Sequence, residues 1–444
     1  MRTDDRSANP PGTLPPPRRG GPTDPSHDEE LRRGIIRTRI RRPTAWFLTL
    51  FFLGLIYAVP LSQMILDHIN EEESVILDLF AGMPDKDSLR QLEEDLENVS
   101  YVKTYVQPRL QLLLTGFGRA GNKRAVVGHD GWLYYEPGVA FLGGPAFLSD
   151  DVLDSRRRTA RTEEGEELHA DPRPAIFAFR EALARRDITL VLFPVADKAM
   201  LVPRPLHGRV PENASVDVPR NLDWNRFLRE MTVAGIPVFD PSPARLEPGE
   251  PPRFLVQDTH WTPEWMAKVA TELAAFVEKT VPLPPATTTP GFTVKAETVS
   301  RIGDIVDMLR LPDDQTLFQP NTVTVQQVLT GADADTGVLF EPDEKADVLL
   351  LGDSFTNIFT LAPMGWGEGA GLGPHLARAL GRPIDVIAQN DAGAFATRRL
   401  LAQELAAGAD RLAGKRVVIW QFAARELGVG DWKPVAWPEA PGGE

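Results

Sequence analysis

The sequence Val348-Leu349-Leu350-Leu351-Gly352-Asp353-Ser354-Phe355 joins an apolar strand to a turn that carries a hydroxyl group. A run of apolar residues such as Val348–Leu351 is typical of a strand that is buried on both faces of a parallel sheet. Ser354 would then lie at the carboxyl end of the strand, where sites gather in open α/β sheets. Taken alone, a Gly-Asp-Ser sequence is equally suited to a helix N-cap or an Asx turn.

A second sequence, Gln257-Asp258-Thr259-His260-Trp261, supplies what a serine nucleophile requires. A serine hydroxyl reacts poorly at neutral pH unless a base lies within hydrogen-bond distance, and His260 is the candidate base. Asp258 lies two residues earlier and can bind Nδ1 of His260, which leaves Nε2 free for Ser354. A metal site is the alternative, but no other His or acid has convincing ligand spacing, so we expect neither a metal nor a cofactor.

Strands and helices alternate along the rest of the chain, which predicts an α/β fold with a parallel sheet and flanking helices. Residues 126–135 predict a hairpin whose turn is Asp130-Gly131. Residues 281–340 are rich in proline at their start, and we expect an irregular insertion there. The other expected strands are 188–195, 236–239, 384–387 and 416–421, and the expected helices are 220–234, one that begins after Thr262, and 395–408.

The segment from Pro43 to Leu66 contains no charged residue and is long enough to cross a bilayer as a helix. Six arginines lie just before it and four acids follow it, so the positive-inside rule places the N-terminus in the cytoplasm. We therefore expect a single-pass anchor in the inner (cell) membrane, with the catalytic domain periplasmic or otherwise extracytoplasmic. A cleaved signal peptide is the alternative, but no small-x-small cleavage site follows the apolar run.

The composition of the chain excludes several classes of function. There is no cysteine among the 444 residues, so disulfides and thiolate chemistry are excluded. Residues 1–42 carry a net charge of +4. The whole chain carries −14, so the remaining residues carry −18. An acidic outer domain argues against nucleic acid as a partner, because phosphate contacts need concentrated Lys and Arg.

These patterns divide the chain into five segments. Residues 1–42 are an arm expected to be disordered. Residues 43–66 are the membrane helix, and 67–125 are a helical stalk in which Pro108 should end or kink a helix. Residues 126–432 form the α/β domain, and 433–444 form a flexible tail.

Several segments together resemble the SGNH-like O-acetyltransferases of bacterial exopolysaccharides, the AlgJ/AlgX-type alginate O-acetyltransferase family. The resemblance covers residues 126 to about 427 and rests on the apolar N-terminal helix and on three motifs. The motifs are Gly128-His129-Asp130-Gly131-Trp132-Leu133, Asp258-Thr259-His260-Trp261 and Gly352-Asp353-Ser354-Phe355. As in that family, the Asp/His pair precedes the serine. Lesser similarities lie in 194–198, 303–309 and 420–427.

The resemblance implies that Ser354 is the nucleophile, His260 the base and Asp258 the residue that orients it. It also implies an SGNH hydrolase-like sheet. Two departures are His129, where the family carries Lys, and Ala423-Ala424 before Arg425, where the family tends to carry acidic residues or proline. The second departure leaves open whether Arg425 meets a sugar or only packs the fold.

Four further residues are candidates for oxyanion stabilisation or substrate binding: Asn390, Gly393, Arg425 and Trp261. Asn390 and Gly393 follow a predicted strand, although Asn390-Asp391-Ala392-Gly393 also suits a plain turn. We expect Lys198 to be a solvated lysine at a strand end. The glycine-rich stretch 365–373 lacks the spacing of a nucleotide-binding loop and is expected to be a flexible loop over the site.

We therefore expect a membrane-anchored O-acetyltransferase that acts by a ping-pong reaction through an acetylated serine. The resemblance implies two partners, a polysaccharide acceptor (alginate-like, cellulose or another exopolysaccharide) and a multi-spanning membrane O-acyltransferase that supplies acetyl groups. Two alternatives stay open. The same three residues would serve a carbohydrate acetyl esterase, and a non-catalytic glycan-binding scaffold of the envelope would need none of them.

Overall fold

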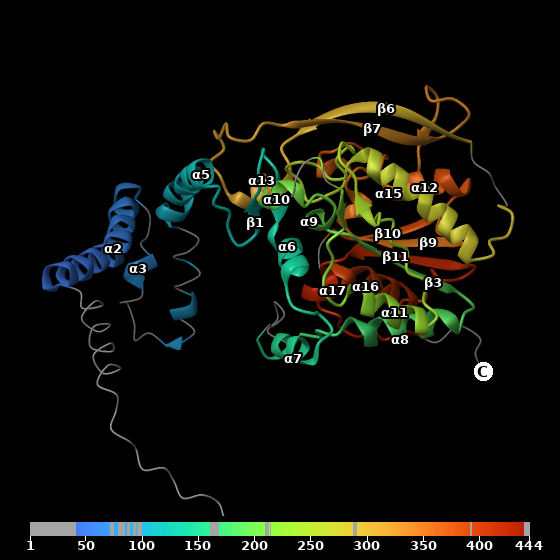
Figure 1. The fold of residues 1–444 in the computed structure, drawn as a ribbon, viewed down its shortest axis with the longest axis horizontal. Coiled ribbons are helices and arrows are strands. Elements are labelled where there is room, and N and C mark those ends of the chain that lie inside the picture. Colours follow the sequence, from blue (N-terminus) through green and yellow to red (C-terminus); the bar gives the residue numbers. More distant parts are fainter. Residues whose placement is uncertain are drawn as a thin grey trace, which may run out of the picture. The chain divides into compact units, whose positions relative to one another are not determined.

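A computed structural model describes residues 41–71, 75–78, 85–86, 89–91, 95, 100–159, 168–208, 213, 215–286, 291–390 and 393–438. The chain divides into two compact units, residues 1–104 and 105–444, and each is described by itself. Elements carry the labels of Figure 1. The expected disordered arm lies almost wholly outside the described residues, as does most of 79–99 in the expected stalk.

The first unit contains α2 (Arg42–Ile69), which includes the whole of the predicted apolar helix. Pro43 occupies its first turn, where a missing N–H costs nothing. Among the described residues, α2 is the one helix long and apolar enough to cross a membrane. Near its end Gln63 donates to Asp67 over 2.7 Å and accepts from the Tyr101 amide over 2.9 Å.

The second unit is built on a four-stranded parallel sheet in the order β10-β9-β11-β3. Every residue of the two inner strands is buried, which explains their continuous Val, Ile and Leu content. The sheet confirms the predicted α/β class. Its strands are β3 (Thr189–Val195), β9 (Val348–Gly352), β10 (Asp385–Ala388) and β11 (Val417–Ala423). The predicted strand 236–239 makes only a parallel bridge, Leu192 to Val238.

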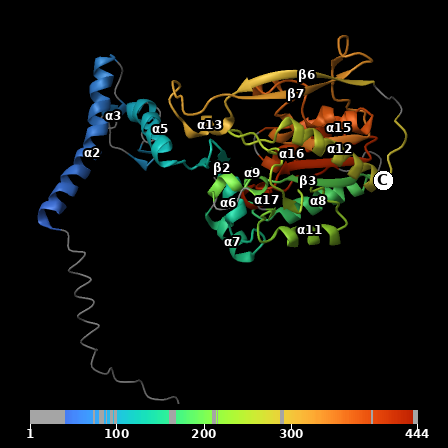
Figure 2. The same cartoon turned by 45° about the horizontal axis from the view of Figure 1, so that its top comes forward.

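Helices cover both faces of this sheet. Helices α12 (Pro263–Thr280) and α15 (Leu372–Leu380) lie together over one face, and α8 (Pro172–Ala184) and α11 (Trp224–Val233) lie on the other (Figures 1 and 2). Thr262 caps α12 by accepting from the Trp265 amide, as its sequence predicted. The unit also contains the longer helix α16 (Gly393–Ala406). Its shorter elements include α6 (Glu136–Gly143), α7 (Asp150–Thr159), α9 (Lys198–Leu201), α10 (Arg204–His207), β4 (Val216–Asp217), β5 (Arg245–Leu246), α14 (Ser354–Asn357), η2 (Ala362–Met364) and α17 (Glu426–Val429).

The region 281–340 is more regular than expected. Strands β6 (Phe292–Arg301) and β7 (Asn321–Thr330) pair in antiparallel register along ten residues each, and β8 (Val338–Leu339) adds to β7. Between them lies the short helix α13 (Asp304–Leu309). The prolines that suggested irregularity precede the strands, whereas the strands themselves are rich in Val and Thr, which favour extended structure.

Of three smaller expectations, one is confirmed and two are corrected by the structure. The hairpin β1 (Ala125–Val127) and β2 (Leu133–Tyr135) forms as predicted, with Asp130 and Gly131 at φ 53° and 78°. Pro108 does not end a helix but lies in the first turn of α5 (Gln107–Gly118), after the π-helical turn η1 (Val102–Val106). The tail is not free throughout, because Trp437 stacks on Phe179 with ring centroids 4.5 Å apart.

Candidate active site

Ser354 lies where the central strand β9 gives way to the short helix α14. The preceding residue, Asp353, caps this helix by accepting from the Phe355 amide over 2.9 Å. Asp353 also accepts from Gln421 over 2.7 Å and from the Ala423 amide over 2.8 Å, which ties the turn to β11. The N-cap and the site are therefore not rival interpretations, since Asp353 forms the cap and presents Ser354 at the end of the sheet.

The structure brings the three predicted residues together. His260 Nε2 lies 2.8 Å from Ser354 Oγ, and His260 Nδ1 lies 2.7 Å from Asp258 Oδ1. His260 and Asp258 are buried, and Ser354 is partly exposed. The His260 ring packs edge-on against Phe355, with centroids 4.9 Å apart, so its orientation is held by packing as well as by hydrogen bonds.

The Asp258 carboxylate is surrounded by donors. Oδ1 also accepts from the His260 amide over 3.1 Å, and Oδ2 accepts from Trp366 Nε1 over 2.9 Å and from the Asp304 amide over 3.1 Å. Burial alone would raise the pKa of Asp258, but the hydrogen bond and charge of His260 hold it at about 2. Burial lowers the pKa of His260, yet Asp258 more than compensates, so this pKa is raised. The pair is built to stabilise an imidazolium.

Trp366 and Asp304 are site residues that the sequence did not single out. Trp366 lies in the loop expected to be flexible, but it is fully buried, so this part of the loop is fixed against Asp258. Asp304 Oδ1 accepts from the Thr259 amide over 2.7 Å, and Oδ2 lies 3.9 Å from His260 Nδ1. Burial and the charge of Asp258 raise the pKa of Asp304 to about 6. The one signal in the sequence was the similarity of 303–309 to the family.

Lys198 is buried rather than solvated, which corrects the expectation. Its Nζ donates to the carbonyl oxygens of Val256 over 2.8 Å and Asp258 over 3.0 Å. The ammonium also lies 5.1 Å from the ring centre of Trp132 and 5.4 Å from that of Tyr134. Burial lowers the pKa of Lys198 to about 7. Lys198 thus holds the backbone that carries Asp258.

Arg425 lies beside the site but is already paired. Its Nη1 donates to Asp197 Oδ1 over 2.9 Å, and its guanidinium lies 4.9 Å from the ring centre of Tyr135 and 5.9 Å from that of Phe355. Asp197 is buried, and its Oδ2 has no hydrogen-bond partner among the described residues. The ion pair therefore braces Phe355, the neighbour of Ser354.

The other three candidates occupy different positions. Asn390 is exposed, and its Oδ1 accepts from Asn357 on α14 over 2.8 Å, so its amide is close to the Ser354 turn. Gly393 begins α16 at φ 55°, and a side chain there would collide with Glu426. Trp261 is only 1% exposed and packs on Phe355 and Phe193, which leaves no surface for the predicted substrate contact.

Asp258, His260 and Asp304 also form a group that could hold a metal ion, with ligand atoms within 4.8 Å of one another. In this structure both nitrogens of the His260 ring lie within hydrogen-bond distance of Asp258 or Ser354, and both carboxylates accept N–H groups. A metal ion bound by these three residues would therefore have to displace those contacts.

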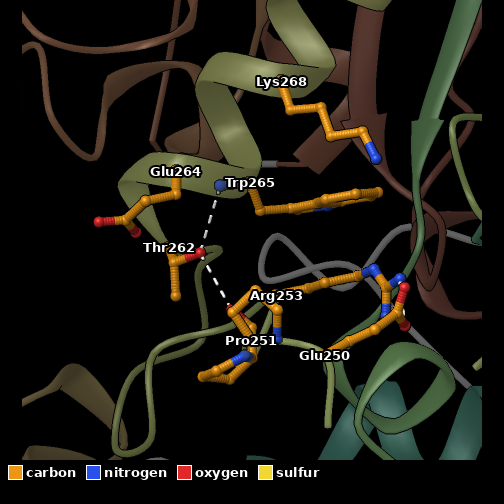
Figure 3. Close-up of a pocket in the computed structure, with 8 residues that line it drawn as sticks. Glu250, Pro251, Arg253, Thr262, Glu264, Trp265 and Lys268 are labelled. Atoms are coloured by element: carbon orange, nitrogen blue, oxygen red, sulfur yellow. Dashed lines mark hydrogen bonds and ion pairs between the residues drawn. The ribbon is translucent and has the colours of Figure 1, made fainter. Parts of the chain in front are cut away.

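A cavity of about 330 Å³ lies next to the loop that carries His260. Two of its lining residues are joined by a backbone hydrogen bond, from the Thr262 amide to the Arg253 carbonyl. The neighbouring hydrogen bond runs from the Leu255 amide to the His260 carbonyl. Figure 3 shows the Trp265 ring between the side chains of Lys268 and Arg253, whose charged groups lie 5.3 Å and 4.9 Å from its centre. Arg253 is buried, and its Nε has no hydrogen-bond partner among the described residues.

Comparisons with known proteins identify the family of the α/β domain. A family model described as "SGNH hydrolase-like domain, acetyltransferase AlgX" matches residues 125–424. A curated relative, the probable alginate O-acetylase AlgJ of Pseudomonas syringae pv. tomato, is 28% identical over 166 residues. That alignment covers 37% of this chain and 36% of the relative, so the chain spans about a third of the relative's length.

Two solved structures are similar at low identity. The O-acetyltransferase domain of Pseudomonas putida AlgJ matches with a TM-score of 0.47 and 21% identity, over 69% of this chain and 93% of that one. Pseudomonas aeruginosa AlgX matches with a TM-score of 0.45 and 17% identity, over 67% of this chain and 61% of that one.

Proposed function

Because the chain belongs to the family of SGNH hydrolase-like acetyltransferase domains typified by AlgX, we propose that it is an O-acetyltransferase that modifies hydroxyl groups of a polysaccharide. The observation that carries this proposal is the continuous hydrogen-bonded line from Asp258 through His260 to Ser354. On this proposal the hydroxyl is the nucleophile, the imidazole is the base and the carboxylate orients the imidazole.

In the first half-reaction the Ser354 hydroxyl oxygen attacks the carbonyl carbon of an acetyl donor. His260 Nε2 takes the hydroxyl proton, and Asp258 stabilises the resulting imidazolium through Nδ1. The tetrahedral intermediate collapses, the bond from carbon to the leaving group breaks, and His260 returns the proton to that group. The product is a Ser354 acetyl ester with neutral His260.

In the second half-reaction a sugar hydroxyl takes the place of the leaving group. His260 removes its proton, the sugar oxygen attacks the acetyl carbon, and the proton passes to Ser354 Oγ as the serine ester breaks. The sugar leaves as an acetate ester and the enzyme is restored. Water competes with the sugar for the acetyl-enzyme, so transfer requires that the sugar be held at the site.

The oxyanion of each intermediate needs donors at the Ser354 turn. The backbone amide of Ser354 and the side-chain NH₂ of Asn390 are the proposed donors, since among the described residues Asn390 is hydrogen-bonded through its oxygen, to Asn357. Gly393 is a third candidate by its position at the start of α16. Arg425 is proposed to hold Phe355 in place rather than to bind sugar.

The cavity beside Trp265 is the proposed position for one sugar unit of the acceptor. It is lined by an indole ring, a buried guanidinium whose Nε has no hydrogen-bond partner among the described residues, and the exposed ammonium of Lys268. Aromatic rings flanked by a few polar groups are usual in small-molecule sites. Thr262, which lines the cavity, lies two residues along the chain from His260, and on this ground we propose that a sugar bound there positions the next part of the polymer for Ser354.

The candidate membrane span α2 supports the proposal that this chemistry is extracytoplasmic. With the arginines before α2 retained in the cytoplasm, the second unit would lie on the opposite side of the membrane. An acetyl donor there must itself cross the membrane, so we propose a multi-spanning membrane O-acyltransferase as the donor partner.

The test is polymer acetylation in cells that carry Ser354→Ala in place of the wild-type chain. Ser300→Ala, an exposed serine on β6, is the matched control. We expect the Ser354 variant to lose polymer acetylation at unchanged protein abundance while the control keeps it. Retained acetylation in the Ser354 variant would leave only a scaffold role, and increased acetylation would identify an esterase.

A further inference from the structure

Helix α5 turns its apolar side chains outward. Leu110, Leu113, Leu114 and Phe117 are spaced i, i+3, i+4 and i+7 and so share one side of the helix, the α5 apolar face. Their exposed fractions are 52%, 55%, 48% and 91%. The one fully buried residue of the helix is the polar Thr115. This is the reverse of the usual pattern for a helix on the surface of a globular domain.

Polar contacts fix the helix in this orientation. Thr115 Oγ1 donates to the carbonyl of Ala120 over 2.8 Å, and Gln111 Nε2 donates to the same carbonyl over 3.0 Å. Arg109 forms an ion pair of 2.9 Å with Asp314 of the same unit. The contacts to Ala120 hold the polar side of α5 against the loop that leads into β1, so the apolar face has no route into the core of its own unit.

The charges around α5 differ from those of the chain as a whole. Residues 105–129 contain four cations and no Asp or Glu, whereas the whole chain has a net charge of −14. All four cations are exposed. They are Arg109, Arg119, Lys123 and Arg124. An apolar helix face flanked by cations is complementary to anionic lipid headgroups over acyl chains.

The chain also keeps α5 close to a bilayer. Helix α2 ends at Ile69 and α5 begins at Gln107, so residues 70–106 link a candidate membrane span to this face. Even fully extended, that link reaches roughly 130 Å. A bilayer spanned by α2 would therefore always lie within this distance of α5, which favours contact between the two.

We propose that the α5 apolar face lies in the headgroup region of an anionic membrane, parallel to its surface, as a second point of attachment after α2. The apolar side chains leave water for the acyl boundary, and Arg119, Lys123 and Arg124 contact lipid phosphates, whereas Arg109 is already paired with Asp314. The inference rests on the proposed membrane anchor but not on the proposed acetyl transfer. It would place the second unit at a fixed height above the membrane.

The absence of cysteine makes a direct test possible, because any single introduced cysteine is labelled uniquely. The full chain is placed in nanodiscs that contain phosphatidylglycerol, with a nitroxide on Phe117→Cys. Val233→Cys is the matched control, since Val233 is an equally exposed apolar residue, 89% exposed, on helix α11. The accessibility of each nitroxide to oxygen and to a water-soluble nickel complex is measured by EPR.

We expect the label at position 117 to be reached by oxygen and shielded from nickel at least threefold relative to the label at position 233. Equal access of nickel to both positions would overturn the proposal. Shielding of position 117 from both agents would show that protein covers the face and would also overturn it. Failure of the chain to enter nanodiscs would remove the anchor and the proposal together, whereas loss of acetyl transfer would leave it untouched. Equal shielding in purely zwitterionic discs would overturn the role of the cations.

Discussion

Asp304→Asn is the substitution that most finely probes the electrostatics of the site. The amide oxygen of asparagine can still accept the Thr259 amide, so the loop geometry is retained while one negative charge is removed. That charge lies 3.9 Å from His260 Nδ1. Burial lowers the pKa of His260, and the charges of Asp258 and, to a smaller extent, Asp304 raise it. The variant should therefore have a lower His260 pKa.

The size of the change follows from the distance. Two unit charges about 4 Å apart interact by about 4 kcal/mol at an effective dielectric constant of about 20. A third of the Asp304 side chain is exposed, so solvent screens much of this energy. After screening, the interaction between the two charges is expected to be about 1.4 kcal/mol, which corresponds to about one unit in the pKa of His260.

The assay is the pH dependence of kcat/KM for acetylation of the enzyme by an activated acetyl ester. Its ascending limb reports the pKa of the base in the free enzyme, because His260 must be neutral to accept the Ser354 proton. We expect Asp304→Asn to move this limb about one unit toward lower pH. Asp307→Asn removes an exposed carboxylate of the same helix whose charge also acts on Asp258, and as the matched comparison it should move the limb less than Asp304→Asn does.

Two results would contradict the prediction that the charge of Asp304 raises the pKa of His260. An unchanged limb in the Asp304 variant would mean that its charge does not reach the imidazole. A limb that moves toward higher pH would mean that the carboxylate acts through the loop geometry and not through its charge.

Three further substitutions test other contacts of the site. Trp366→Phe removes a hydrogen bond to a buried carboxylate, so we expect acetyl-enzyme formation to slow by roughly 1.5–3 kcal/mol of barrier, about 10- to 150-fold, in stopped-flow kinetics, and an unchanged rate would contradict this. Lys198→Met leaves two buried carbonyls without a donor and should cost about 1–3 kcal/mol of unfolding free energy in urea. Because burial lowers the Lys198 pKa to about 7 in the fold, the wild type should also gain stability over this variant as pH rises from 7 to 10, and parallel stability curves would argue against that. Trp265→Ala should raise KM for an oligosaccharide acceptor severalfold with little change in the rate of acetylation by a small ester, and an equal loss in both would place Trp265 outside the acceptor site.

Local patterns in the sequence were sufficient for the parts of the site that depend on neighbouring residues. The apolar strand before Ser354, the Asp258–His260 pair two residues apart and the Thr262 cap all follow from spacing, and the structure has each of them. The meeting of Ser354 with His260 across 94 residues was inferred from complementary chemistry rather than from any local rule.

The residues that were missed act over long separations through groups that a sequence pattern does not reveal. Trp366 reaches Asp258 across 108 residues from a loop whose glycines suggested mobility, and one tryptophan among nine carries no mark of that role. Lys198 binds backbone carbonyls, which every residue has, so nothing in its neighbourhood predicted burial. Asp304 acts from a helix in a region that its prolines made seem irregular.

The most direct test of the proposed Ser354 acetyl-enzyme is mass spectrometry of the intact protein after brief exposure to an activated acetyl ester. A single acetyl adduct should map to the peptide that contains Ser354, be absent from His260→Ala, and disappear on addition of oligosaccharide as acetylated sugar forms. An adduct on any other residue, or its release only to water in the presence of the sugar, would contradict the account.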